Sequence, residues 1–179
     1  TYHNAKNAET FGVELDVKKN LDFIGLRGLS FVCNAAYIYS RVRFEEGAPE
    51  RDRPLAGQSP YLVNAGFFYQ YDDKGISASL LYNRIGKRIE SVGVPMQNQD
   101  EDIPDIYEMP RNSLDLTFSK KIGKIVEIKA GIQDILNSKV EYKQFVKLTD
   151  DKGGKSEREQ LIRSYRPGVD INIGVSLRF

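Results

Sequence analysis

The chain lacks tryptophan and has only one cysteine and one histidine among its 179 residues. A single cysteine excludes an internal disulfide framework, and one cysteine with one histidine excludes most zinc sites. Neither sign of charge is in excess, because 26 Lys and Arg nearly balance 25 Asp and Glu, whereas a nucleic-acid-binding domain usually carries a basic face. The carboxylates along the chain come with no matching nucleophile or base. We therefore expect no enzymatic activity, no cofactor and no nucleic-acid partner.

Long apolar runs are absent as well. A transmembrane helix needs about 20 consecutive apolar residues, and the longest runs here are only a few residues. The first residues, Thr1–Asn7, show neither an initiator methionine nor a signal-peptide pattern. We therefore expect a processed chain or a fragment of a larger protein.

The chain is rich in alternation of apolar and polar residues with a period of two. This pattern is typical of a β-strand with one apolar and one polar face. It is cleanest at the C-terminal end, where the odd positions are apolar, and it recurs six more times. The seven predicted strands are 10–21, 29–43, 61–71, 76–89, 112–121, 125–137 and 169–179.

The predicted connections alternate between short and long. The short ones are 20–28, 72–75 and 122–124, and the long ones are 44–60, 90–110 and 138–167. In an antiparallel meander this order places all short turns at one end and all long loops at the other, as in outer-membrane barrels. Most strands also reach the 9–11 residues or so that cross a bilayer. A soluble β-sandwich, whose strands alternate in the same way, remains an alternative.

Aromatic residues fall at two levels along these strands, as interfacial girdles require. Tyr39 and Tyr61 lie toward the long loops. The aromatics toward the short turns are Phe31, Tyr69, Tyr71, Phe118 and Phe179. Because single-chain bacterial barrels have even strand numbers and tolerate no open edge, seven strands predict part of a larger barrel.

The C-terminal residues Asn172, Gly174, Leu177 and Phe179 resemble the signal that the outer-membrane barrel assembly machinery reads. That signal has a polar residue, a glycine two positions later, apolar residues and a terminal aromatic. The resemblance implies that the assembly machinery and outer-membrane lipid are partners of this chain.

More of the chain is similar to the C-terminal barrel of TonB-dependent outer-membrane receptors, especially those of Bacteroidetes-type bacteria. The segments Asn4–Leu15, Gly57–Gly66, Arg111–Leu116 and Gly131–Asn137 resemble four strand motifs of that family, in the family's order and spacing. The resemblance implies that residues 1–179 form about the last seven strands of a transmembrane barrel of about 22. The plug domain and TonB box of the family lie N-terminal to this region and are absent from the sequence.

The same resemblance implies active uptake of a nutrient, such as a ferric siderophore, cobalamin or an oligosaccharide, across the bacterial outer membrane. The TonB complex would act through the plug. An alternative is a passive outer-membrane channel or a structural barrel without a plug.

The three long loops are the candidate ligand-binding segments. Loop 138–167 has eight basic and five acidic residues, and loop 44–60 contains Arg51 and Arg53. With Arg158 and Arg163 they could attract an anionic ligand; a mixed, solvated loop surface is the alternative. Loop 90–110 contains Asp100, Asp102 and Asp105, whose carboxylates could hold a hard cation such as Ca²⁺, although the spacing is not that of an EF-hand. We expect a solvated acidic loop and no metal.

Overall fold

The computed structural model describes residues 4–96, 102–149 and 155–178, which form antiparallel β-sheets. The all-β prediction is confirmed. Seven strands make up the larger sheet, named here the long sheet. They are β1 (Asn7–Asn20), β2 (Leu29–Arg43), β3 (Tyr61–Tyr71), β4 (Ile76–Ile85), β7 (Arg111–Ile122), β8 (Val126–Gln133) and β11 (Asp170–Leu177). The remaining elements are β5 (Arg88–Ser91), β6 (Ile106–Glu108), β9 (Val140–Thr149), β10 (Lys155–Tyr165) and the short 3₁₀ helices η1 (Asp22–Ile24) and η2 (Asp72–Lys74). No helix in the described ranges is long and apolar enough to span a membrane.

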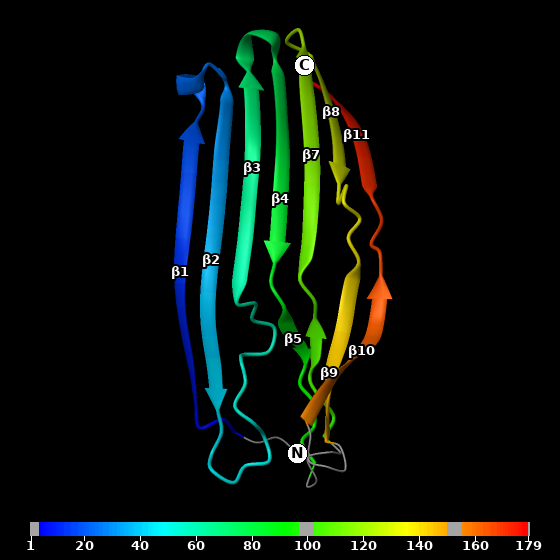
Figure 1. The fold of residues 1–179 in the computed structure, drawn as a ribbon. Helices are drawn as coiled ribbons and strands as arrows, with labels where there is room; N and C mark the ends of the chain where they lie inside the picture. The colour runs from blue at the N-terminus through cyan, green and yellow to red at the C-terminus, as the bar shows by residue number, and fades with distance from the viewer. Residues whose placement is uncertain (1–3, 97–101, 150–154, 179) are drawn as a thin grey trace.

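The strands of the long sheet lie in the order β1-β2-β3-β4-β7-β8-β11. They correspond to the seven predicted strands, and the bounds of β2 and β3 are those predicted. Figure 1 shows the short turns together at one end of the sheet and the long connections together at the other, as the loop lengths predicted. The sheet does not close on itself in the described residues, since β1 and β11 form its two edges.

The register of this sheet collects the apolar residues on one face. One row of partners crosses all seven strands. The row is Lys19, Phe31, Phe67, Leu80, Leu116, Ile132 and Ile171. Six of these seven residues are apolar, so the alternation in each strand becomes a continuous apolar surface, named here the apolar face.

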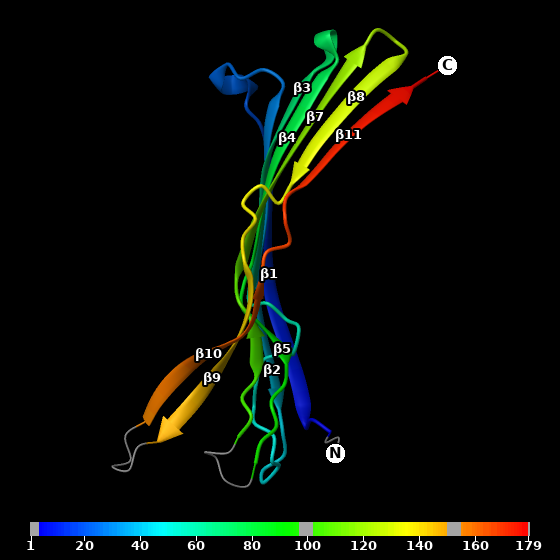
Figure 2. The same ribbon diagram turned by 90° about the vertical axis from the view of Figure 1, so that its right-hand side faces the viewer.

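No second layer covers the apolar face in the described part of the chain. Figure 2 shows the sheet edge-on as a single layer, and the side chains of Val13 and Ile173 are 73% and 76% exposed. The accessible area is 12885 Å², whereas a compact protein of this mass exposes about 8,800 Å². The sheet therefore lacks the packed interior that a β-sandwich has.

The opposite, polar face is tied together by hydrogen bonds between neighbouring strands. Asn34 Nδ2 donates to Asp16 Oδ1 at 2.7 Å, and Asn83 Nδ2 donates to Asn64 Oδ1 at 2.5 Å. The hydroxyl oxygens of Ser77 and Ser119 are 2.7 Å apart, and those of Ser79 and Thr117 are 2.6 Å apart. Such cross-strand pairs stabilise a sheet and satisfy polar groups that face one another.

The loop predictions for 90–110 and 138–167 are wrong in part, because both contain strands. A second sheet has the order β10-β9-β6-β5 and lies at the end with the long connections (Figures 1 and 2). The strand pattern of β10 is hidden because consecutive charged residues, Glu157 to Glu159, occupy both of its faces. β9 begins with alternation of apolar and charged residues, but Gln144 and Phe145 interrupt it.

Two predicted strands also end early. The predicted strand 76–89 is interrupted after β4, where Gly86 packs so tightly that an added Cβ would lie 2.8 Å from Ser59 Oγ. The predicted strand 125–137 stops at Gln133, because Asp134 and Asn137 have positive φ angles of 52° and 43°. Left-handed residues of this kind do not continue a strand.

The register can be tested with the single cysteine. Cys33 is the cross-strand partner of Ala65, and Asn64 is the partner of Asn34 on the other face. We expect Ala65→Cys to form a disulfide with Cys33 on mild oxidation, because directly opposed residues fall within disulfide reach. Mass spectrometry of the oxidised protein measures the crosslink. Asn64→Cys is the matched control, and equal crosslinking of both variants would contradict the register.

Candidate functional site

The long connections line a cavity of about 700 Å³ at their end of the molecule, and this cavity is open to solvent. Its walls come from residues 50–54, from residues 92–95 and 102–105, and from the second sheet at β6, β9 and β10. These segments belong to the three loops that the sequence marked as candidate ligand-binding segments. The structure thus brings parts of all three to one cavity, which we call the loop cavity.

Arg51 joins two of these segments. Its guanidinium forms an ion pair with Asp102, and the other carboxylate oxygen of Asp102 accepts the backbone N–H of Met96 at 2.8 Å. The Arg51 side chain is 52% exposed and that of Asp102 is 14% exposed. The pair therefore anchors segment 102–105 to the connection after β2 and leaves Arg51 partly open to solvent.

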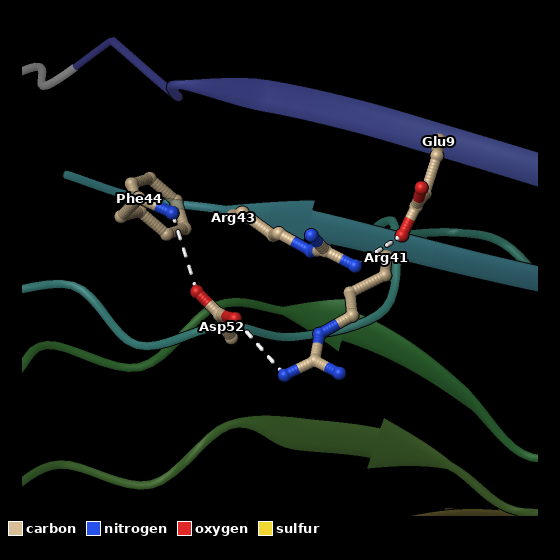
Figure 3. Close-up of polar contacts among 5 residues, drawn as sticks. All are labelled: Glu9, Arg41, Arg43, Phe44 and Asp52. Carbon is tan, nitrogen blue, oxygen red and sulfur yellow. Dashed lines mark hydrogen bonds and ion pairs between the residues drawn. The ribbon is translucent and has the colours of Figure 1, made fainter.

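The next residues hold that connection against β2, as Figure 3 shows. Asp52 accepts hydrogen bonds from Arg41 Nη2 at 3.0 Å and from the backbone N–H of Phe44 at 3.2 Å. Arg53 forms an isolated antiparallel bridge with Val42, and its guanidinium carbon lies 5.6 Å from the Phe44 ring centroid. Backbone pairing and carboxylate bonding together fix the position of both predicted arginines.

An aromatic pair on the second sheet holds a lysine at the cavity wall. Lys87 Nζ lies 4.3 Å from the ring centroid of Tyr107 and 4.4 Å from that of Phe145. The two rings meet edge to face with centroids 5.7 Å apart. An ammonium group in this position gains cation–π attraction from both rings. Burial, followed by the nearby Asp105 carboxylate, raises the pKa of the Tyr107 hydroxyl.

Sequence reasoning missed Lys87, Tyr107 and Phe145. They come from three separate segments, which meet only because β6 pairs with both β5 and β9. The alternation of Val140, Tyr142 and neighbouring charged residues was the available signal for β9, and no local signal marks Lys87.

Arg158 and Arg163 do not line the loop cavity. Both lie on β10, where Arg158 is opposite Val146 and Arg163 is opposite Tyr142. The guanidinium carbon of Arg163 stacks 4.1 Å from the Tyr142 ring centroid. Only two of the four predicted arginines therefore contribute to the cavity wall.

The predicted acidic loop uses its carboxylates internally. Asp105 accepts the backbone N–H of Gly93 at 2.7 Å, and Asp102 is bonded as described above. Asp100 lies outside the described residues. The described ranges contain no group of three or more residues suited to hold a metal ion.

Charges of both signs line the loop cavity. The bases are Arg51, Arg53, Lys87 and Lys147, and the acids are Glu50, Asp52, Asp102, Asp105 and Glu157. Several of these groups are paired with one another or with the sheet, so the wall as a whole does not select an anion by charge. Apolar side chains, aromatic rings and both kinds of hydrogen-bonding group suit non-covalent binding of a polar organic molecule.

The predicted assembly signal lies on an edge strand. Leu177 points to the apolar face and is 56% exposed. Asn172 and Gly174 fall on the polar face, opposite Gly131 and Lys129. Phe179 lies outside the described residues. Among the described residues β11 pairs only with β8, so its outer edge has no partner strand in that part of the chain.

No protein-family model, curated protein or solved structure matches this chain.

The loop cavity depends on a close backbone approach at Gly93. A Cβ on this residue would lie 2.0 Å from the Ile103 carbonyl oxygen and 2.9 Å from the Asp105 nitrogen. We expect Gly93→Ala to separate segments 92–95 and 102–105, because backbone cannot yield as a side chain does. Hydrogen exchange of the amides in 102–108 should accelerate at least tenfold.

Gly12→Ala is the control for this variant, since its nearest contact would be an ordinary 3.4 Å from the Tyr37 oxygen. Unchanged exchange in Gly93→Ala would show that the two segments do not depend on this contact.

Proposed function

We propose that this chain is part of the wall of a transmembrane β-barrel in a bacterial outer membrane, belonging to a TonB-dependent receptor for nutrient uptake. The observation that carries the proposal is the apolar face, which crosses seven strands and is covered by no other element among the described residues. Lipid would cover such a face, while the polar face would line a lumen.

The stagger of the strands supports a barrel. The row of partners through Lys19, Phe67 and Leu116 lies at a different distance from the short turn on each strand. β1 ends at Asn20, one residue after its row residue Lys19. β3 ends at Tyr71, four residues after Phe67, and β7 ends at Ile122, six residues after Leu116. If the turns share one plane, this stagger inclines the strands by about 40°, within the range of barrel strands.

The two edges support a larger closed structure. Within the described ranges β1 and β11 each have one unpaired side, and unpaired backbone groups are not tolerated in lipid. Further strands would pair with both edges and close the barrel. The loop cavity would then lie at the extracellular end, where long loops occur in these barrels, and would receive a small molecule or metal chelate.

The receptor function rests on the resemblance of the strand motifs Gly57–Gly66 and Arg111–Leu116 to the family. A passive channel or structural barrel would share the same wall and differ by having no plug. Outer membranes from the source organism distinguish these cases. A product several times larger than 20.3 kDa that contains plug peptides supports the receptor, and a product without a plug supports the channel.

The lipid-facing wall can be tested with adjacent residues on β1. Leu15 lies on the apolar face and Glu14 on the polar face. We expect Leu15→Arg to destabilise the membrane-inserted protein by about 2–4 kcal/mol, because a cation near the bilayer midplane is costly, and Glu14→Arg to have little effect.

The amount of folded protein in isolated outer membranes measures this difference. Recovery of the wild-type protein in the soluble fraction without detergent would refute the barrel wall and favour a sandwich.

The assembly signal is tested separately by deletion of Phe179. We expect the level of the protein in the outer membrane to fall at least fivefold, since the assembly machinery would no longer find a terminal aromatic residue. Immunoblots of membrane fractions provide the measurement, with Phe179→Tyr as the control that keeps an aromatic ring. Normal levels after the deletion would show that the C-terminus carries no such signal.

A further inference from the structure

We propose that the short-turn end of the apolar face binds the anionic headgroups of the phospholipid leaflet around it. The inference rests on the proposed function, in that it needs the apolar face to contact lipid. It adds a site for a chemically defined partner, at the end of the sheet opposite to the loop cavity.

Cations mark this end of the apolar face. Lys19 and Lys120 stand in apolar-face positions, opposite Phe31 and Ile128 respectively. Three more bases lie in the short turns. They are Arg27, Lys74 and Lys124. The acids of these turns are Asp22, Asp72 and Asp73, so the turns themselves are balanced, and Lys19 and Lys120 give this end an excess of two positive charges.

These cations lack ionic partners. None of the five bases lies within 4.0 Å of a carboxylate oxygen of any described residue. Lys120 Nζ donates to the Lys74 carbonyl oxygen at 2.5 Å, and a lysine ammonium has three donors. Donors therefore remain for an external acceptor.

The opposite end of the same face is different. There Arg43 Nη2 lies 2.7 Å from Glu9 Oε1, and Arg41 Nη2 lies 3.0 Å from Asp52 Oδ2 (Figure 3). Lys6 is likewise 3.6 Å from Glu45. Arg43, Arg41 and Lys6 are thus paired with carboxylates of the chain itself. The five bases at the short-turn end have no such pair among the described residues and are left for a partner.

Apolar groups around the free cations favour a lipid over a free phosphate ion. Lys19 Nζ lies 5.3 Å from the Phe23 ring centroid, and Lys74 Nζ lies 5.5 Å from that of Tyr71. Phe23 is 70% exposed, and Ile122 and Ile125 are 52% and 55% exposed. A lysine with an apolar stem beside exposed rings fits the boundary between acyl chains and headgroups. A free anion would leave the apolar side chains in water.

The test uses the whole gene product that carries this chain, purified in detergent and reconstituted into phosphatidylcholine vesicles. The vesicles contain a trace of spin-labelled phosphatidylglycerol or spin-labelled phosphatidylcholine. The motionally restricted component of each spectrum gives the relative affinity of the two lipids for the protein surface. We expect phosphatidylglycerol to be preferred by roughly three- to fivefold at low salt and the preference to shrink as salt screens the charges.

Matched variants locate the preference on one face. Lys19→Gln with Lys120→Gln should reduce it to near parity. Lys18→Gln with Lys121→Gln removes the same charge at the same end but on the polar face, and should leave the preference unchanged. Lys19→Arg with Lys120→Arg keeps the charge and should also retain it.

Three outcomes separate the two proposals. Equal loss in both glutamine pairs, or wild-type protein with a restricted component but no lipid preference, overturns this inference and leaves the barrel wall intact. Absence of a restricted component for both lipids shows that the face does not contact a bilayer, and then the proposed function fails as well. If the first glutamine pair does not reconstitute, the arginine pair and the salt dependence of the wild type still decide the question.

Discussion

The cross-strand register of the seven-stranded sheet is the constraint on which the rest of the structure depends. Side chains alternate between faces, so a slip of one residue in any pair would move a whole strand's apolar set to the polar side. The pairings from β1 to β11 contain no register shift, whereas those of β5 with β6 and of β9 with β10 do. The seven-stranded sheet therefore keeps one register from edge to edge, and the register shifts are confined to the second sheet.

That division also explains where a ligand cavity can form. A regular sheet offers only flat surfaces, and bulged strands bend and redirect side chains. The shift between Ile89 and Ser91 in β5 lies next to the wall that carries Lys87 and Tyr107. The cavity is thus built at the end where the register breaks, and its walls are held by charges such as Arg51 and Asp102 that the long sheet does not use.

The sequence predicts the long sheet well because alternation of apolar and polar residues within each strand shows which side chains lie on which face. The bounds of β2 were predicted without error, since its odd positions are apolar from Leu29 to Tyr39. The second sheet was missed because Gln144 and Phe145 interrupt the alternation of β9, and because β10 carries charged residues on both faces. The contact of Lys87 with Phe145 depends on the pairing of β6 with β5 and with β9, which are far apart in the chain. The period-two pattern within one strand does not show which strand pairs with which.

The strand stagger and the free lysines support each other. Lys19 and Lys120 do not share a row, since the partner row of Lys19 reaches β7 at Leu116, four residues before Lys120. On an upright sheet the two ammonium groups would lie about 14 Å apart in height. Four strand spacings separate β1 from β7 in the sheet. If the strands are inclined by about 40°, as barrel strands are, the shift in height across these four spacings nearly cancels the offset of four residues, and both lysines lie at about the same height. A common level is what a planar headgroup layer requires, so the geometry that favours a barrel also aligns the cations that would meet its lipid.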